Sequence, residues 1–141
     1  MAERYFPANL IRICLDKEDE VNVEGRVYSK LSPEPVFFKS CEEFILETDR
    51  IFDRAGYPQA FQDKRRFRGQ EACAPYSAHP RLYLTDEEIG RQRGAVWTRD
   101  VIVAARRGNS WQGILLGEDG RREMTFDGEM KLMEYLFFRR R

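Results

Sequence analysis

Histidine and cysteine are scarce in this chain, which has one histidine and three cysteines among 141 residues. The histidine, His79, lies in a loop-like stretch and has no nucleophile motif such as GxSxG beside it, so we predict no catalytic residue. The cysteines are widely spaced and form no CxxC pair, which argues against a metal site. Unpaired, unclustered thiols (Cys14, Cys41 and Cys73) are typical of the reducing cytoplasm, where we place the protein.

Phosphate-binding glycine patterns and long apolar runs are also missing. Neither GxGxxG nor the P-loop pattern occurs, so we predict no nucleotide cofactor. No apolar run approaches the roughly 18 residues that cross a membrane, and Met1–Pro7 lacks the apolar region of a signal peptide, so we expect no membrane partner. The 24 basic and 24 acidic residues cancel, which argues against a polycation that binds nucleic acid through its overall charge.

An internal repeat is the most informative feature that is present. Gly25 and Phe38 lie thirteen positions apart, as do Gly113 and Phe126, at a constant offset of 88. Other apolar positions follow the same offset: Val23 and Trp111, Val27 and Leu115, Val36 and Met124, and Phe44 and Leu132. The layout predicts an α+β fold of two antiparallel βββα units in a pseudo-twofold arrangement, with the helices packed on the sheet and Trp111 in the core.

The first unit, residues 1–56, has well-marked elements. Period-two alternation predicts strands over roughly 9–15, around Val23 to Val27, and over 36–39. Gly25 lies on an apolar face, at a bulge or at a close crossing. Ser40 and Glu43 form a capping box in which the Glu43 carboxylate reaches the Ser40 amide, and Gly56 provides a stop, so a helix is predicted over 41–55.

The second unit, residues 99–141, repeats this order with shorter loops. Strands are predicted over 101–106 and 110–116, followed by a hairpin turn at Asp119-Gly120 and a third strand. Asp127 is the expected N-cap of the last helix. Its apolar face is predicted from four residues: Met130, Met133, Leu136 and Phe137.

The connection between the units, residues 57–98, is irregular, although the whole chain, 1–141, is predicted to be a single domain. A short helix is expected from Pro58 to Phe67. A second short helix follows a capping box formed by Thr85 and Glu88, and Gly94 is expected to close it. Such a long connection either wraps over the surface or contacts a partner.

The candidate interaction patch is basic with one aromatic residue: Lys64, Arg65, Arg66, Phe67, Arg68, Arg106 and Arg107. Arginine and aromatic side chains stack on bases and pair with phosphates, whereas the alternative interpretation is a solvated helix end. Residues 1–56 carry a net charge of −4 and residues 57–141 a net charge of +4, so the zero total conceals two opposed halves. A local basic face in the second half is therefore compatible with overall neutrality.

Three functions remain open from the residues alone. The leading interpretation is a non-enzymatic protein–protein interaction module, with an unidentified protein partner and a possible homodimer. The first alternative is a single-stranded nucleic-acid-binding protein that uses the basic and aromatic central segment. The second is a small carboxylate-based enzyme, which requires a cleft that gathers two or more acids.

Four segments of the chain resemble a family of small hypothetical proteins from clostridia-type gut bacteria. They are residues 4–16, 54–61, 83–88 and the motif Ser110-Trp111-Gln112-Gly113. The resemblance extends over nearly the whole chain and implies a soluble bacterial protein. It carries over no activity, cofactor or site residue.

Overall fold

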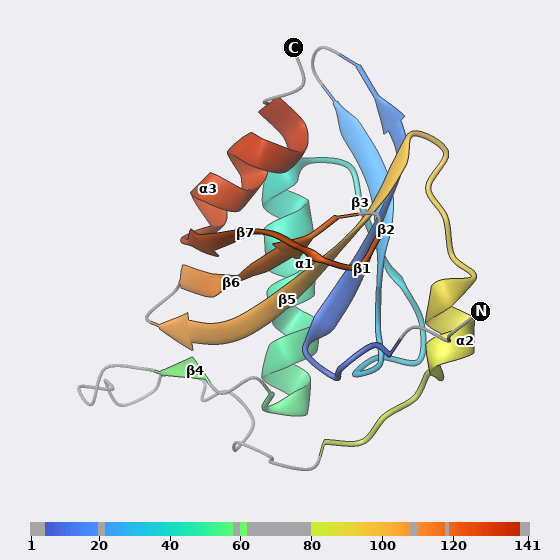
Figure 1. Cartoon of the computed structure of the whole chain (residues 1–141), viewed down its shortest axis with the longest axis vertical. Helices are drawn as coiled ribbons and strands as arrows, with labels where there is room; N and C mark the ends of the chain where they lie inside the picture. The colour runs from blue at the N-terminus through green and yellow to red at the C-terminus, as the bar shows by residue number, and fades with distance from the viewer. Residues whose placement is uncertain are drawn as a thin grey trace.

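The computed structural model describes residues 5–19, 22–57, 60–61, 80–107, 110–117 and 119–138. They form an α+β fold around one antiparallel sheet of six strands in the order β3-β2-β1-β5-β6-β7 (Figure 1). The strands are Leu10–Glu18 (β1), Val23–Ser29 (β2), Val36–Phe38 (β3), Trp97–Arg107 (β5), Ser110–Leu116 (β6) and Arg122–Asp127 (β7). A short further strand, Ala60–Phe61 (β4), pairs in parallel with the end of β5. The α+β class predicted from the sequence is therefore confirmed.

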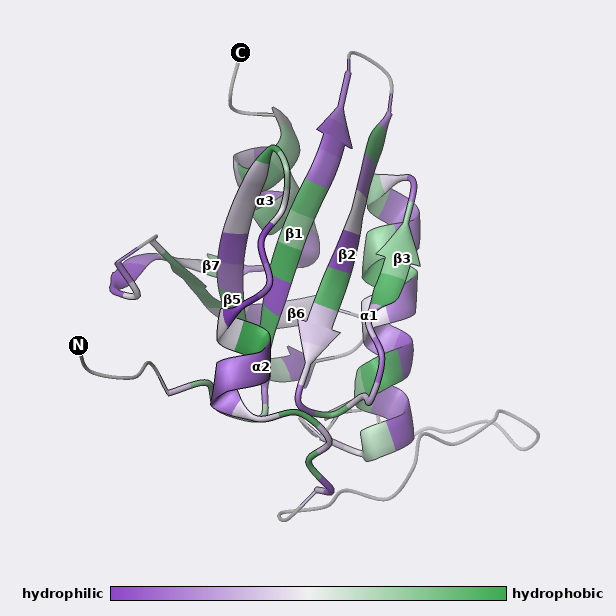
Figure 2. Ribbon diagram, turned by 90° about the vertical axis from the view of Figure 1, so that its right-hand side faces the viewer, coloured by the Kyte–Doolittle hydropathy of each residue, from purple (hydrophilic) through white to green (hydrophobic). Residues whose placement is uncertain are grey.

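Helices cover both faces of this sheet. α1 (Cys41–Ala55) and α3 (Glu129–Met133) lie on one face, and α3 continues as the π-helical segment η1 (Glu134–Phe138). α2 (Asp86–Gly90) lies on the opposite face (Figure 2). Because the centre of the sheet is covered twice, every residue from Leu10 to Leu15 in β1 is buried. None of the described helices has the length and apolar character needed to cross a membrane.

The larger core fills the space between the sheet, α1 and α3. Its aromatic rings meet edge to face: Phe44 contacts both Trp111 and Phe137, with ring centroids 6.0 and 5.9 Å apart. Trp111 is only 1% exposed, as its position in the repeat predicts. Aromatic rings that interlock in this way remove large apolar areas from water and fix how α1 and α3 lie on the sheet.

Glycine is required at both positions that anchor the repeat. Gly25 of β2 faces Phe38 of β3, and Gly113 of β6 faces Phe126 of β7. A Cβ atom at either glycine would overlap a carbonyl oxygen of the neighbouring strand and press on the facing phenylalanine ring. The close crossing expected at Gly25 is thus confirmed, and the register of β1 also shifts opposite this position.

A buried ion pair fastens α2 to the second face of the sheet. Arg12 of β1 and Asp100 of β5 face each other in register, and two hydrogen bonds of 2.8 and 2.9 Å join the guanidinium to the carboxylate. The remaining Arg12 nitrogen, Nη1, donates to the carbonyls of Ile89, Gly90 and Gln92 at the end of α2. The two side chains are 4% and 3% exposed, so the ion pair that orients this guanidinium toward α2 is shielded from water.

α1 spans the residues predicted from its capping signals. Ser40 Oγ accepts a hydrogen bond from the Glu43 amide at 3.0 Å, and Gly56 adopts φ of 66°. One detail differs, because the Glu43 carboxylate accepts from the Lys39 amide at 2.9 Å instead of from Ser40. The helix buries a stripe against the sheet: Phe44, Thr48, Ile51 and Phe52.

The last helix differs from the prediction. Asp127 is the final residue of β7 rather than an N-cap, and its carboxylate accepts a 3.2 Å hydrogen bond from Gln112 of the neighbouring strand. Gly128, with φ of 104°, precedes α3 and provides no side-chain cap. Met130, expected on the apolar face, is 64% exposed, and Leu132 is buried in the core. The other three predicted residues, Met133, Leu136 and Phe137, are buried as expected, so the predicted apolar face is wrong only at Met130. The cross-strand pairing of Asp127 delays the start of the helix.

The connection between the halves also departs from expectation. The helix predicted over 58–67 is wrong at Ala60–Phe61, which pair with β5 as β4, and the rest of that segment lies outside the described residues. α2 ends at Gly90 and not at Gly94. A Cβ atom at Gly94 would overlap the backbone of Leu15 and Trp97, so this glycine permits a close approach to β1 instead of ending a helix.

Candidate binding cavity

The candidate interaction patch falls mostly outside the described residues. Nothing is described for residues 64–68, and Arg107 contributes only its backbone, which continues β5 beside β4. Arg106 is described, and its side chain points into the protein with only 4% exposure. The role assigned to residues 64–68 stays a prediction, whereas Arg106 has an internal role.

Arg106 ties α1 to the sheet. Its Nη1 atom donates to Asp49 at 3.1 Å and to Asp53 at 2.6 Å, both on the side of α1 that meets β5. Asp49 also accepts a 3.0 Å hydrogen bond from the Trp111 indole nitrogen. The guanidinium lies over the ring of Phe52, 5.4 Å from its centroid. This network orients α1 and uses its carboxylates for packing.

Other described carboxylates are held in their ionised form. The hydrogen bond from Arg26 lowers the pKa of Asp16, and the hydrogen bond from Lys30 lowers the pKa of Asp86. A general acid needs the opposite shift, because it must keep its proton near neutral pH. These two carboxylates therefore serve as ion-pair partners.

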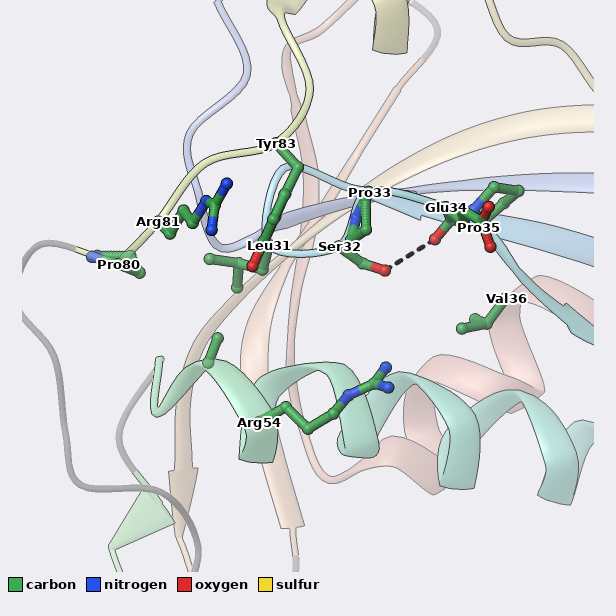
Figure 3. Close-up of a pocket in the computed structure, with 11 residues that line it drawn as sticks. Leu31, Ser32, Pro33, Glu34, Pro35, Val36, Arg54, Pro80, Arg81 and Tyr83 are labelled. Atoms are coloured by element: carbon green, nitrogen blue, oxygen red, sulfur yellow. Dashed lines mark hydrogen bonds between the residues drawn. The ribbon is translucent and has the colours of Figure 1, made fainter.

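A cavity of about 500 Å³ lies at the end of α1. One wall is the β2–β3 loop, residues 31–36, and the opposite wall is the last turn of α1, with Arg54 and Ala55. Pro80, Arg81 and Tyr83 close one side (Figure 3). In this view Arg81 and Glu34 lie at opposite ends of the row of loop residues, and the Arg54 side chain extends along the helix beneath them. The size falls within the range of known ligand sites.

Local hydrogen bonds hold the β2–β3 loop in shape. Ser29 Oγ accepts from the Leu31 amide at 3.0 Å, and Ser32 Oγ donates to the Glu34 carbonyl at 2.8 Å. Pro33 and Pro35 restrict the backbone further, since each fixes its own φ. A loop held in this way loses little additional conformational freedom when a ligand binds.

The other walls are anchored as firmly. The Tyr83 amide donates to the Lys30 carbonyl at 2.8 Å, and Lys30 forms an ion pair with Asp86 of α2. At the end of α1, the amides of Gly56 and Tyr57 donate to the carbonyls of the last turn, which sets the exit of the chain. The cavity is thus a preformed feature of the fold.

Two guanidinium groups line this cavity. Arg54 and Arg81 are exposed, and within the described part of the chain neither forms an ion pair with a carboxylate. The guanidinium carbon of Arg81 lies 4.8 Å from the centroid of the Tyr83 ring, which keeps the cation and the ring together. Glu34 contributes the one carboxylate among the described lining residues, so these side chains carry a net charge of +1.

Apolar side chains lie exposed beside these charges. Leu82 and Tyr83 are 52% and 42% exposed, although large apolar residues are usually covered. We call the lining residues Arg54, Arg81 and Tyr83, together with Leu82, which is exposed beside them in the chain, the cavity rim. Tyr5 is exposed nearby, where its ring meets Lys30.

Sequence reasoning did not identify this site. Pro33, Pro35 and Pro80 signal loops correctly, but the rim depends on a backbone contact between Lys30 and Tyr83, which are far apart in the chain. No local pattern encodes such a contact. The available signal was the combination of arginine, tyrosine and leucine in residues 81–83, a composition typical of binding surfaces.

Among the described residues, no group of three or more histidine, cysteine or acidic side chains is placed to hold a metal ion. His79 and Cys73 lie outside these residues. Comparison of the chain with protein-family models, with curated proteins and with solved structures found no match.

Proposed function

We propose that this protein is a non-catalytic module that binds a partner protein at the cavity rim. The observation that carries the proposal is a preformed cavity of about 500 Å³ lined by exposed Tyr83 and two exposed arginines. Tyrosine and arginine dominate the binding energy of protein interfaces because they bury large areas and form directed hydrogen bonds. A rigid pocket between them suits the insertion of a partner side chain.

The carboxylates support a binding role over the carboxylate-based enzyme. Each of five described aspartates is engaged by a basic side chain that also fixes local structure: Asp16, Asp49, Asp53, Asp86 and Asp100. Among the described residues that line the cavity, Glu34 is the one carboxylate. Acid–base hydrolysis of the predicted kind requires a facing pair of carboxyl groups.

A peptide selection tests the proposed function. Random peptides selected on the immobilised wild-type protein are expected to lose at least about tenfold in affinity when Tyr83 is replaced by alanine, because the ring forms part of the contact area. Met130→Ala is the matched control, since Met130 is a similarly exposed apolar residue on α3. Equal binding of the selected peptides to wild type and Tyr83→Ala contradicts the proposal.

We also propose that the two βββα units are related by a pseudo-twofold axis that passes between Arg12 and Asp100. Positions separated by 88 support it: Gly25 and Gly113 face Phe38 and Phe126, and their Cβ positions meet the carbonyls of Cys14 and Ile102. Arg12 and Asp100 are themselves 88 positions apart and face each other. A twofold axis that exchanges β1 with β5 must pass between two equivalent positions that face each other, and Arg12 and Asp100 are such positions.

A cytoplasmic location is part of the proposal. The free thiols of Cys14 and Cys41 support it, because unpaired cysteines are typical of a reducing compartment. The homodimer stays a prediction, which the molar mass from light scattering tests.

A further inference from the structure

We propose that the cavity recognises an acidic segment of the partner protein, with a carboxylate bound at the two arginines of the lining, Arg54 and Arg81. This inference rests on the proposed function and names the chemistry of the partner at the same site. It starts from the way the chain uses its arginines. Most described arginines already bond a carboxylate within the chain: Arg12, Arg26, Arg50, Arg91, Arg99, Arg106 and Arg121.

Arg54 and Arg81 differ from that group and share one cavity. Within the described residues, neither is paired with a carboxylate, although acidic side chains are as numerous as basic ones in the sequence. Arg54 lies in the last turn of α1, where its charge complements the helix dipole without using its N–H donors. Guanidinium groups from two separate elements therefore line the same cavity, and each offers planar N–H donors that suit a carboxylate.

The charge of the lining favours a carboxylate over a phosphate. Arg54 and Arg81 together with Glu34 give a net charge of +1, which one carboxylate neutralises. A phosphate group carries nearly two negative charges and would meet repulsion from Glu34. Because Figure 3 places Glu34 at the end of the loop away from Arg81, the space near Arg81 is the less acidic part of the cavity.

The exposed apolar residues favour a peptide as the carrier of that carboxylate. The Tyr83 ring lies against Arg81, and Leu82 is exposed next to them in the chain, so both offer contact area to the residues that flank an aspartate or glutamate. A second copy of this chain fits less well. A twofold contact would set the arginines of one rim against those of the other, and a head-to-tail contact would continue without closing.

The experiment uses the peptides selected on the wild-type protein. We expect enrichment of aspartate and glutamate, and fluorescence anisotropy should show about a tenfold loss of affinity when the key acid of the best peptide becomes its amide. Arg54→Gln and Arg81→Gln are expected to lower the affinity for the acidic peptide by a similar factor. Both variants should leave the affinity for the amide peptide nearly unchanged. Arg122→Gln, at an exposed arginine of β7, is the matched control and should leave the affinity within about twofold.

The outcomes separate the two proposals. If Tyr83→Ala weakens binding but the acid-to-amide change and both glutamine variants do not, the carboxylate inference is wrong and the proposed function stands. If the selection yields no peptide, or only peptides insensitive to Tyr83→Ala, the proposed function fails and the inference fails with it. Unfolding midpoints of the variants should match the wild type, since both arginines are exposed.

Discussion

Replacing Asp100 by asparagine tests the buried ion pair that fastens α2 to the sheet. The change removes the negative charge and one of the two acceptor oxygens, so the buried guanidinium of Arg12 faces a neutral amide. Breaking a buried pair typically costs about 3–5 kcal/mol. The amide oxygen retains one hydrogen bond, so we expect a loss near 3 kcal/mol. Because the free energy of unfolding of a small domain is about 5–15 kcal/mol, this loss is a large fraction of the total stability.

Urea unfolding followed by tryptophan fluorescence measures this loss. The unfolding midpoint should fall with little change in the slope, because the surface exposed on unfolding is the same. Asp119→Asn is the control: Asp119 is 3.8 Å from Arg121 in a solvent-exposed ion pair, and its removal should shift the midpoint little. If Asp100→Asn costs no more than Asp119→Asn, the reasoning about charge burial is refuted.

Three further predictions concern stability and reactivity. Gly25→Ala and Gly113→Ala should each lower the free energy of unfolding in urea by about 1–3 kcal/mol, because each new methyl group would overlap a backbone carbonyl. An unchanged free energy of unfolding at either position would contradict the close approach of the strands there. Burial raises the pKa of Cys14 to about 11, so this thiol should react with iodoacetamide at pH 8 only under unfolding conditions. Rapid labelling of Cys14 itself in the native protein, located by peptide mass spectrometry, would count against its burial. The pKa values of Asp16 and Asp86 are lowered, so the stability that these carboxylates contribute is complete above the ordinary pKa of 3.8 and is lost as the pH falls through the lowered values. The urea midpoint of the wild type should therefore decline in that acid range, and the midpoint of Asp86→Asn should decline less steeply.

Sequence patterns predict helices and strands correctly where residues close together in the chain determine them. α1 has the predicted bounds because Ser40 and Gly56 satisfy its terminal backbone groups through neighbours in the chain. β6 spans the predicted residues 110–116 because its alternation matches a strand with one face in the core. The close crossing expected at Gly25 is also present, because this glycine lies on the apolar face of β2 and faces Phe38.

Non-local contacts decide the remainder. β5 begins at Trp97, before the predicted residue 101, because pairing with β1 extends it. β4 exists through its pairing with Arg106 and Arg107, which no local signal announces. The cavity depends on the backbone contact of Tyr83 with Lys30. Arg106 is buried because its guanidinium binds two aspartates of α1, Asp49 and Asp53.

The outermost strands limit the ways in which another molecule can join this protein. β3 is three residues long and follows Pro33 and Pro35, while β7 exposes charged residues such as Arg122 and Glu123. Short, proline-flanked or charged strands resist the addition of a further strand through backbone hydrogen bonds. A partner is therefore steered away from extending the sheet and toward side-chain recognition, and at high concentration the protein should resist fibre formation through its sheet edges.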